Sequence, residues 1–288
     1  MDKDDGEPLP PTGMILVMQI VGSLLYYALA VDCTLLVALS DLSATQSKAT
    51  TTTWDTIVWL LNYCASNPNA EVKYIASDMC LHTHSDASYL SAPKARSRAG
   101  AHFFLSDKPA PPVPLADVPI NGPIHVICKI IKCVMGSAAE AEIGAGFLCA
   151  KDILPIRVCL EEMGHPQPPT PIQIDNTTAV GFANKTIKQR ASKAIDMRFY
   201  WLQDRVNQNQ FIIYWSPGKN NLGDYHTKHH PAYHHKDMRP TILHSPNFVS
   251  NLALLLLRGC AKPQYGLPHA GAIQPNNITP PPYVGYHY

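Results

Sequence analysis

Residues 124–148 read IHVICKIIKCVMGSAAEAEIGAGFL, and this stretch decides the fold class. Its first nine residues are β-rich with a period of two, which is typical of a strand with one buried face. Ser137 and Glu140 then have the spacing of a capping box, which marks the start of a helix. The Ala-rich residues that follow continue this helix. The stretch therefore predicts a strand followed by a helix.

The segments on either side extend this pattern. Upstream, further runs with strand character cover residues 72–75, 79–85 and 99–105. Downstream, we expect helices at 153–163, 177–183 and 194–208 and strands at 172–174 and 211–215. Strands followed by alternating helices and strands are typical of a mixed sheet with helices on its faces. The sequence therefore predicts an α/β fold.

Composition divides the chain into four parts. Residues 1–13 are acidic and Pro-rich, and we expect them to be disordered. Residues 14–70 have helical periodicity and end at a breaker, Asn67-Pro68-Asn69. Residues 71–232 hold the α/β pattern. Residues 233–288 are rich in His, Pro and Tyr, and we expect a mostly irregular tail there.

Residues 14–31 contain no charged side chain, and their length reaches the lower limit for a membrane-spanning helix. Gln19, Gly22 and Ser23 dilute the apolar character, and no cluster of Lys or Arg flanks the segment. We therefore expect a buried helix and no membrane contact. A membrane anchor at residues 14–31 is the less favoured alternative.

Overall composition excludes several classes of protein. The 288 residues carry a net charge of +1 and only 16% charged residues, so no general basic field favours bulk nucleic-acid binding. The eight cysteines include no C-x-x-C pair, and the sequence lacks the pattern of a secretory signal peptide. We expect reduced thiols in an intracellular protein, cytoplasmic or nuclear and not secreted.

Four acids lie where predicted strands end or helices begin: Asp86, Glu142, Asp175 and Asp224. The carboxyl ends of strands in an α/β sheet are where ligand sites collect. Converging carboxylates need a cation to remain ionised together, and hard oxygen ligands suit Mg²⁺ or Mn²⁺. Two such ions about 3.5–4 Å apart hold the attacking and leaving oxygens of a phosphodiester displacement.

Each acid also has a purely structural interpretation. Asp86 is placed for an Asx-turn, and Asp175 and Asp224 for helix N-caps. Glu140 is the natural capping-box acid, which leaves Glu142 for chemistry. No single one of these acids is a specific signal.

Their sequence contexts taken together are specific. The blocks lie between about residues 79 and 228, and they are His84-Ser-Asp86-Ala-Ser-Tyr89, Arg96-Ser-Arg98-Ala-Gly100, Ser137-Ala-Ala-Glu-Ala-Glu142, Asp175-Asn176-x-x-Ala179, residues 188–196, and Pro217-Gly218-x-Asn220-Asn221-Leu-Gly-Asp224-x-x-Thr227-Lys228. In order and spacing this half of the chain resembles the ribonuclease H domain of copia-type retrotransposon polyproteins. A shorter block, Gln19-Ile-Val-Gly22-Ser23-Leu-Leu-Tyr26, resembles the end of the polymerase region, its thumb or connection.

The resemblance implies a ribonuclease H-like mixed five-stranded sheet with helices on both sides. It implies that Asp86, Glu142, Asp175 and Asp224 are the catalytic acids, that they bind two Mg²⁺ or Mn²⁺ ions, and that Asp86 bridges the two. The implied reaction is cleavage of the RNA strand of an RNA–DNA hybrid. Lys188, Arg190 and Lys193 are then candidates for contacting backbone phosphates, the alternative being a solvated helix face.

The sequence also departs from that family. No Tyr-x-Asp-Asp occurs, so we expect no polymerase active site, although the polymerase part of a polyprotein is a candidate partner. Ala101 stands where a second Gly is common, which predicts an altered turn. A catalytically inactive remnant that only binds nucleic acid is the main alternative. The histidines at 226, 229, 230, 234 and 235 suggest a metal site, but we favour a flexible polar tail.

Overall fold

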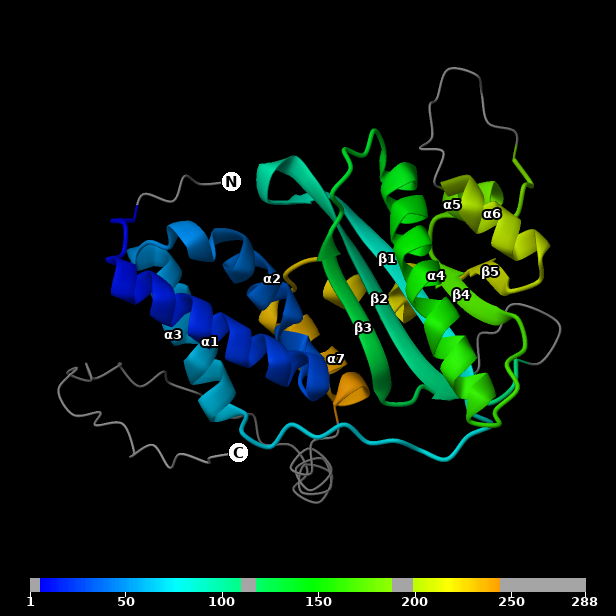
Figure 1. Cartoon of the computed structure of the whole chain (residues 1–288), viewed down its shortest axis with the longest axis horizontal. Coiled ribbons are helices and arrows are strands. Elements are labelled where there is room, and N and C mark those ends of the chain that lie inside the picture. The colour runs from blue at the N-terminus through cyan, green and yellow to red at the C-terminus, as the bar shows by residue number, and fades with distance from the viewer. Residues whose placement is uncertain (1–5, 110–117, 188–198, 244–288) are drawn as a thin grey trace, which may run out of the picture. The chain divides into compact units, whose positions relative to one another are not determined.

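A mixed five-stranded sheet forms the centre of the protein (Figure 1). In the computed structural model the described residues are 6–109, 118–187 and 199–243, and they lie within one compact unit, Met1–Pro246. The strand order is β3-β2-β1-β4-β5. The strands are β1 (Cys80–Ala92), β2 (Arg96–Ser106), β3 (Pro123–Ile130), β4 (Thr170–Ile174) and β5 (Phe211–Trp215).

Strand pairing gives the sheet its mixed character. β1, β2 and β3 pair antiparallel in a meander, whereas β4 pairs parallel to β1 and β5 pairs parallel to β4. Parallel neighbours need crossover connections, and helices supply them on both occasions. This arrangement confirms the predicted mixed five-stranded sheet with flanking helices.

β1 differs from the strand expected at 79–85. It continues to Ala92, so Asp86 lies inside the strand and not at its end. Antiparallel pairing with β2 extends it, with Asp86 opposite Gly100, before a short 3₁₀ turn at Pro93–Ala95. Residues 72–75 form no strand, which corrects the other expectation for this region.

Three helices cover one face of the sheet: α4 (Ala138–Glu162), α5 (Thr177–Ala183) and α6 (Tyr200–Asn207). Their core includes Phe103 from β2 and Leu202 from α6, both fully buried. α4 begins as the sequence predicts, since Ser137 Oγ accepts from Glu140 N at 3.2 Å. The Glu140 carboxylate bonds Gly136 N at 2.7 Å instead of the N-cap amide.

Residues 138–162 form one continuous helix, where the sequence suggests a separate piece from 153. Pro155 lies inside it. Proline in a helix interior removes one backbone hydrogen bond and costs about 3 kcal/mol. Burial of Ile153 and Leu160 on either side of the proline holds the helix together. The predicted helix at 194–208 is described from Phe199 onward, and α6 begins at Tyr200.

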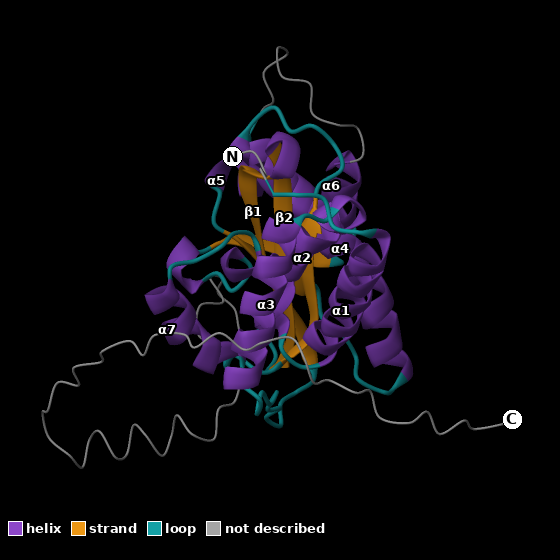
Figure 2. Ribbon diagram, turned by 90° about the vertical axis from the view of Figure 1, so that its left-hand side faces the viewer, coloured by secondary structure: helices purple, strands orange, loops and turns teal. Residues whose placement is uncertain are grey.

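Four helices form a second apolar cluster on the other side of the sheet: α1 (Pro11–Ala30), α2 (Leu36–Thr45), α3 (Thr51–Ser66) and α7 (Ala232–Ile242). Figures 1 and 2 show α1–α3 on the side of the strands away from α4. Val126 of β3 joins this cluster with Tyr225 and Ile242. The boundary predicted at residue 70 therefore separates a helical part of the chain from a strand-rich part, and both belong to one compact unit.

α1 has one buried stripe, formed by Val17, Val21 and Ala28. By length and composition it is the one described helix able to cross a membrane, a test that core helices and signal sequences also pass. Only 17% of its most apolar window is buried, and Tyr26 and Leu29 are exposed. The helix expected at 14–31 is therefore present, but it is buried on one side only.

The two ends of the described chain are more ordered than the sequence predicts. Leu9 N donates to Ala49 O at 3.0 Å, and α1 already begins at Pro11. At the other end, the first residues of the predicted irregular tail form α7. Contacts over long sequence distances hold α7, including an Arg239–Asp32 ion pair at 3.2 Å. Residues 244–288 of that tail lie outside the described residues.

Candidate active site

Two of the four predicted acids come together just beyond the paired region of two neighbouring parallel strands, β1 and β4. Asp175 directly follows β4. Asp86 lies two residues beyond His84, the last β1 residue paired with β4. Because β1 and β4 run in the same direction, both carboxylates reach the same edge of the sheet. Asp86 is 5% exposed, and Thr227 Oγ1 donates to its Oδ2 at 3.0 Å.

Glu142 brings a third carboxylate to this edge from the first turns of α4. Its side chain is 6% exposed. Ala87 N, next to Asp86 in β1, donates to Glu142 Oε1 at 3.2 Å, which fixes the carboxylate against the strand. The other oxygen, Oε2, is buried and has no hydrogen-bond partner in the described structure.

The three carboxylates form one cluster. Asp86, Glu142 and Asp175 each offer an oxygen, and these oxygens lie within 4.8 Å of one another. Burial, followed by repulsion from Asp86 and Asp175, raises the pKa of Glu142 to about 9. Burial and the charges of Asp224 and Asp175 raise the pKa of Asp86 to about 7. Burial also raises the pKa of Asp175, and the charge of Asp224 adds to this rise.

Asp224, the fourth predicted acid, lies beside this cluster with partners of its own. It is close enough for its charge to raise the pKa of both Asp86 and Asp175. Lys228 Nζ is 2.5 Å from its Oδ1, and His230 Nε2 is 3.8 Å from its Oδ2. The structure therefore joins Asp86, Glu142 and Asp175 directly and places Asp224 at their margin.

This donor set fits a hard divalent cation. Burial first, and then repulsion between the carboxylates, raises their pKa values. The buried Glu142 Oε2 also lacks a hydrogen-bond partner in the described structure. Carboxylate oxygens are the ligands that Mg²⁺ and Mn²⁺ prefer. Asp86, Glu142 and Asp175 are thus the residues that would hold such an ion, with Asp224 within reach of the same cluster.

The segment that carries Asp224 packs tightly on β1 and β2. Asn221 Nδ2 donates to Ser85 O at 2.8 Å, and Leu222 N donates to His84 Nδ1 at 3.2 Å. Gly100 permits this approach, because a Cβ at that position would collide with the Gly223 carbonyl. Gly100 therefore lies inside β2 under this segment, and the turn predicted to be altered near Ala101 is continuous strand.

Sequence reasoning missed a charge pair beneath this segment. Arg98, 2% exposed on β2, forms an ion pair with Asp41 of α2 and donates to Thr227 O at 3.4 Å. Thr227 in turn donates to Asp86. Arg98 and Thr227 both belong to the motif blocks, and this could have pointed to a role for them. Burial of Arg98 was not predicted, because charged side chains are seldom found in a core.

The histidine-rich segment is more structured than the flexible polar tail predicted for it. His226 is fully buried and stacks on His102, with ring centroids 5.7 Å apart. Burial lowers the pKa of His226 to about 3. His235 Nε2 is 2.8 Å from the hydroxyl of Tyr63 in α3. His226 is thus held by burial against β2, and packing of α7 against the N-terminal helices orders His235.

The predicted phosphate-contacting side chains, Lys188, Arg190 and Lys193, lie outside the described residues. Among the described residues, Lys228 is the cation paired with Asp224. Burial opposes its charge, but the hydrogen bond to Asp224 and the charge of that carboxylate raise the pKa of Lys228.

Comparison with known proteins places this geometry in context. No family model matches the sequence. The Retrovirus-related Pol polyprotein from transposon TNT 1-94 of Nicotiana tabacum is 22% identical over 175 residues, which are 61% of this chain and 12% of that protein. The chain is similar to a retrotransposon Pol polyprotein. This match confirms the resemblance predicted from the motif blocks and is consistent with a copia-type ribonuclease H region. The chain therefore matches only about an eighth of the length of the tobacco polyprotein.

Two solved structures are also similar to part of the chain. LC11-RNase H1, isolated from compost by a metagenomic approach, is 13% identical with a TM-score of 0.35, over 52% of this chain and 93% of that one. The N-terminal RNase H domain of Rv2228c from Mycobacterium tuberculosis is 11% identical with a TM-score of 0.33, over 51% of this chain and 95% of that one.

Proposed function

We propose that this chain is a metal-dependent endonuclease that cleaves the RNA strand of RNA–DNA hybrids, as the ribonuclease H region of a retrotransposon polyprotein. The observation that carries the proposal is the cluster of Asp86, Glu142 and Asp175. Their oxygens lie within 4.8 Å of one another where β1, the end of β4 and the first turns of α4 meet. The similarity to a Pol polyprotein supports the same assignment.

Each residue of the cluster has a defined part in this proposal. Asp86, Glu142 and Asp175 would hold the divalent cations, and Asp224 at their margin would contribute to holding a second ion. Thr227 orients Asp86, and the Ala87 amide orients Glu142. When bound, Mg²⁺ or Mn²⁺ supplies Lewis-acid activation of a water and of the scissile phosphate. A dry, preorganised site strengthens these interactions relative to water.

The substrate and partners follow from the same proposal. In this proposal the RNA strand lies over the acid cluster, where it is cleaved. The 2′-hydroxyl is the group by which a protein distinguishes RNA from DNA at a binding site. Lys188, Arg190 and Lys193 would contact backbone phosphates. The polymerase part of the same polyprotein is the proposed protein partner.

A cleavage assay with the purified full chain tests the proposal. We expect cleavage of a labelled RNA–DNA hybrid with Mg²⁺ or Mn²⁺ and none with EDTA. Asp175→Asn should lower cleavage by at least a hundredfold and leave hybrid binding intact. Asp55→Asn, an exposed acid on α3, is the matched control and should cleave as the parent does.

The outcomes separate the two main interpretations. Absence of cleavage by the parent chain with either metal would contradict the proposal. Retained hybrid binding in that case would identify the chain as a catalytically inactive, nucleic-acid-binding remnant. Cleavage that survives Asp175→Asn would show that the acid cluster is not the active site.

A further inference from the structure

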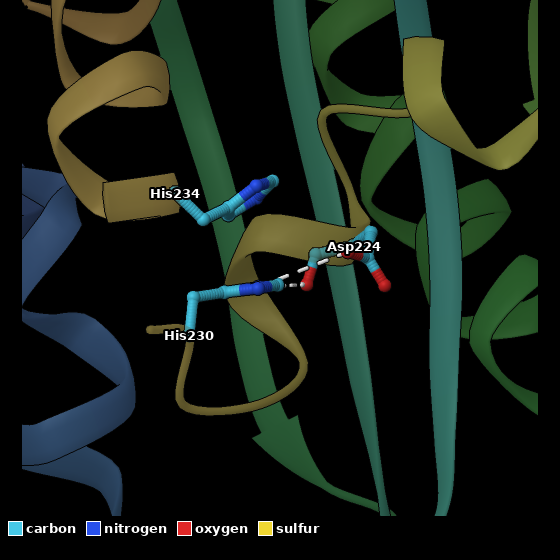
Figure 3. A group of neighbouring side chains, drawn as sticks. All are labelled: Asp224, His230 and His234. Atoms are coloured by element: carbon cyan, nitrogen blue, oxygen red, sulfur yellow. Dashed lines mark hydrogen bonds and ion pairs between the residues drawn. The ribbon is translucent and has the colours of Figure 1, made fainter. Parts of the chain in front are cut away.

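Asp224, His230 and His234 form a second group of metal-ligating side chains at the margin of the acid cluster (Figure 3). Asp224 opens the short 3₁₀ turn Asp224–His226, His230 lies in the connection that follows, and His234 lies in the first turn of α7. Each offers one ligand atom, and the three atoms lie within 4.8 Å of one another.

The two imidazoles face each other and the carboxylate. The ring centroids of His230 and His234 are 4.4 Å apart, with the planes tilted by 30°. His230 Nε2 lies 3.8 Å from Asp224 Oδ2 and 3.2 Å from the Asp224 carbonyl oxygen. Within the described residues the His234 ring makes no hydrogen bond, so its ring nitrogens are free for a ligand.

Neighbouring contacts hold the ligands in place. Tyr225 stacks on His230 with centroids 5.5 Å apart and planes 8° apart. α7, which carries His234, is fixed to the N-terminal helices through His235 and Tyr63 at 2.8 Å. Lys228 holds Asp224 Oδ1 at 2.5 Å and leaves Oδ2 toward His230. Such fixed outer contacts are typical supports of metal ligands.

The donor set differs in chemistry from the all-oxygen acid cluster. Two imidazole nitrogens and one carboxylate oxygen suit a borderline transition-metal ion such as Zn²⁺, whereas carboxylates alone suit Mg²⁺. Three protein ligands leave the fourth tetrahedral position to water or another ligand. We propose that Asp224, His230 and His234 bind one Zn²⁺ ion at a site that borders the acid cluster and shares the Asp224 carboxylate with it.

Titration of the metal-free full chain tests the proposal. Calorimetry with Zn²⁺, in the presence of excess Mg²⁺, should show one tight ion that depends on both histidines. Co²⁺ used as a probe should give the visible absorption of a tetrahedral ion. His230→Gln and His234→Gln should each weaken Zn²⁺ binding at least tenfold and abolish that absorption.

Matched variants make the result decisive. His165 lies outside the group of Asp224, His230 and His234, and its side chain makes no hydrogen bond among the described residues. His165→Gln should therefore leave Zn²⁺ affinity unchanged. Glu142→Gln, in the acid cluster, should also leave it unchanged. Circular dichroism shows whether each variant is folded. Because there are two independent histidine variants, the test still works if one of them fails to fold. Unchanged Zn²⁺ affinity in folded His230→Gln and His234→Gln overturns the proposal, as does a tenfold loss in Glu142→Gln.

Discussion

Removing the charge of Glu142 should stabilise the metal-free protein while it impairs the proposed catalysis. The folded state raises the pKa of this buried carboxyl from its usual 4.5 to about 9. The stabilising effect of its protonated form is fully present below pH 4.5 and is lost as the pH rises toward 9. Glu142→Gln keeps an oxygen for the Ala87 amide but has no proton to lose.

The size of the effect follows from the pKa difference. Three pH units separate 4.5 from 7.5, and each corresponds to about 1.4 kcal/mol, so the ionisable side chain costs up to about 4 kcal/mol at pH 7.5. Burial of the amide offsets part of this gain. We expect Glu142→Gln to raise the free energy of unfolding by about 2–4 kcal/mol in EDTA, which is about 5–15 °C in Tm.

Thermal unfolding at two pH values, with and without Mg²⁺, measures this prediction. At pH 4 the gain should shrink below about 0.5 kcal/mol, because both states then bind the proton. Saturating Mg²⁺ should favour the parent chain instead, since a ligand stabilises the state that binds it. Glu162→Gln, an exposed acid on the same helix, should change stability by less than about 0.5 kcal/mol. An equal gain at pH 4 and pH 7.5, or no gain at all, would refute the reasoning that burial and carboxylate repulsion disfavour the charged form of Glu142.

Three further predictions concern the framework of the site. Asp41→Asn leaves the Arg98 guanidinium buried without its counter-charge and should lower the free energy of unfolding in urea by about 2–4 kcal/mol. Recovery of stability in the double variant Asp41→Leu/Arg98→Met would support this reason, whereas an unchanged urea midpoint of Asp41→Asn would contradict it. Gly100→Ala places a methyl group against the Gly223 carbonyl, so it should lower the free energy of unfolding by about 1–3 kcal/mol and reduce hybrid cleavage. A Tm and a cleavage rate equal to those of the parent would show that the close approach does not matter. Leu202→Ala opens a cavity at a fully buried position and should cost about 2–5 kcal/mol by denaturant titration, whereas a loss below 1 kcal/mol would be too small for a packed core.

The two sites meet at Asp224. Its charge affects the acid cluster, and its Oδ2 lies toward His230. A cation bound by His230 and His234 would therefore draw on the same carboxylate that borders the proposed nuclease site. Zn²⁺ added to a Mg²⁺-supported cleavage reaction should lower the rate, and His234→Gln should relieve that inhibition.

Local pattern in the sequence was enough to predict the order of strands and helices. Period-two runs, the Ser137 cap and the spacing of the acids depend on neighbours a few residues away, so they can be recognised without the fold. They predicted the mixed sheet and the position of Asp175 after β4, but they placed Asp86 at the end of its strand, whereas it lies inside β1. The length of β1 was missed, because pairing with β2 extends it beyond its own hydrophobic pattern.

Only the tertiary structure decided which distant side chains meet. The burial of Arg98 depends on Asp41, 57 residues away in sequence. The approach of His230 and His234 to Asp224 depends on α7 packing against helices from the other end of the chain. Such contacts arise when separate apolar faces are buried together, and no local periodicity encodes which faces those are.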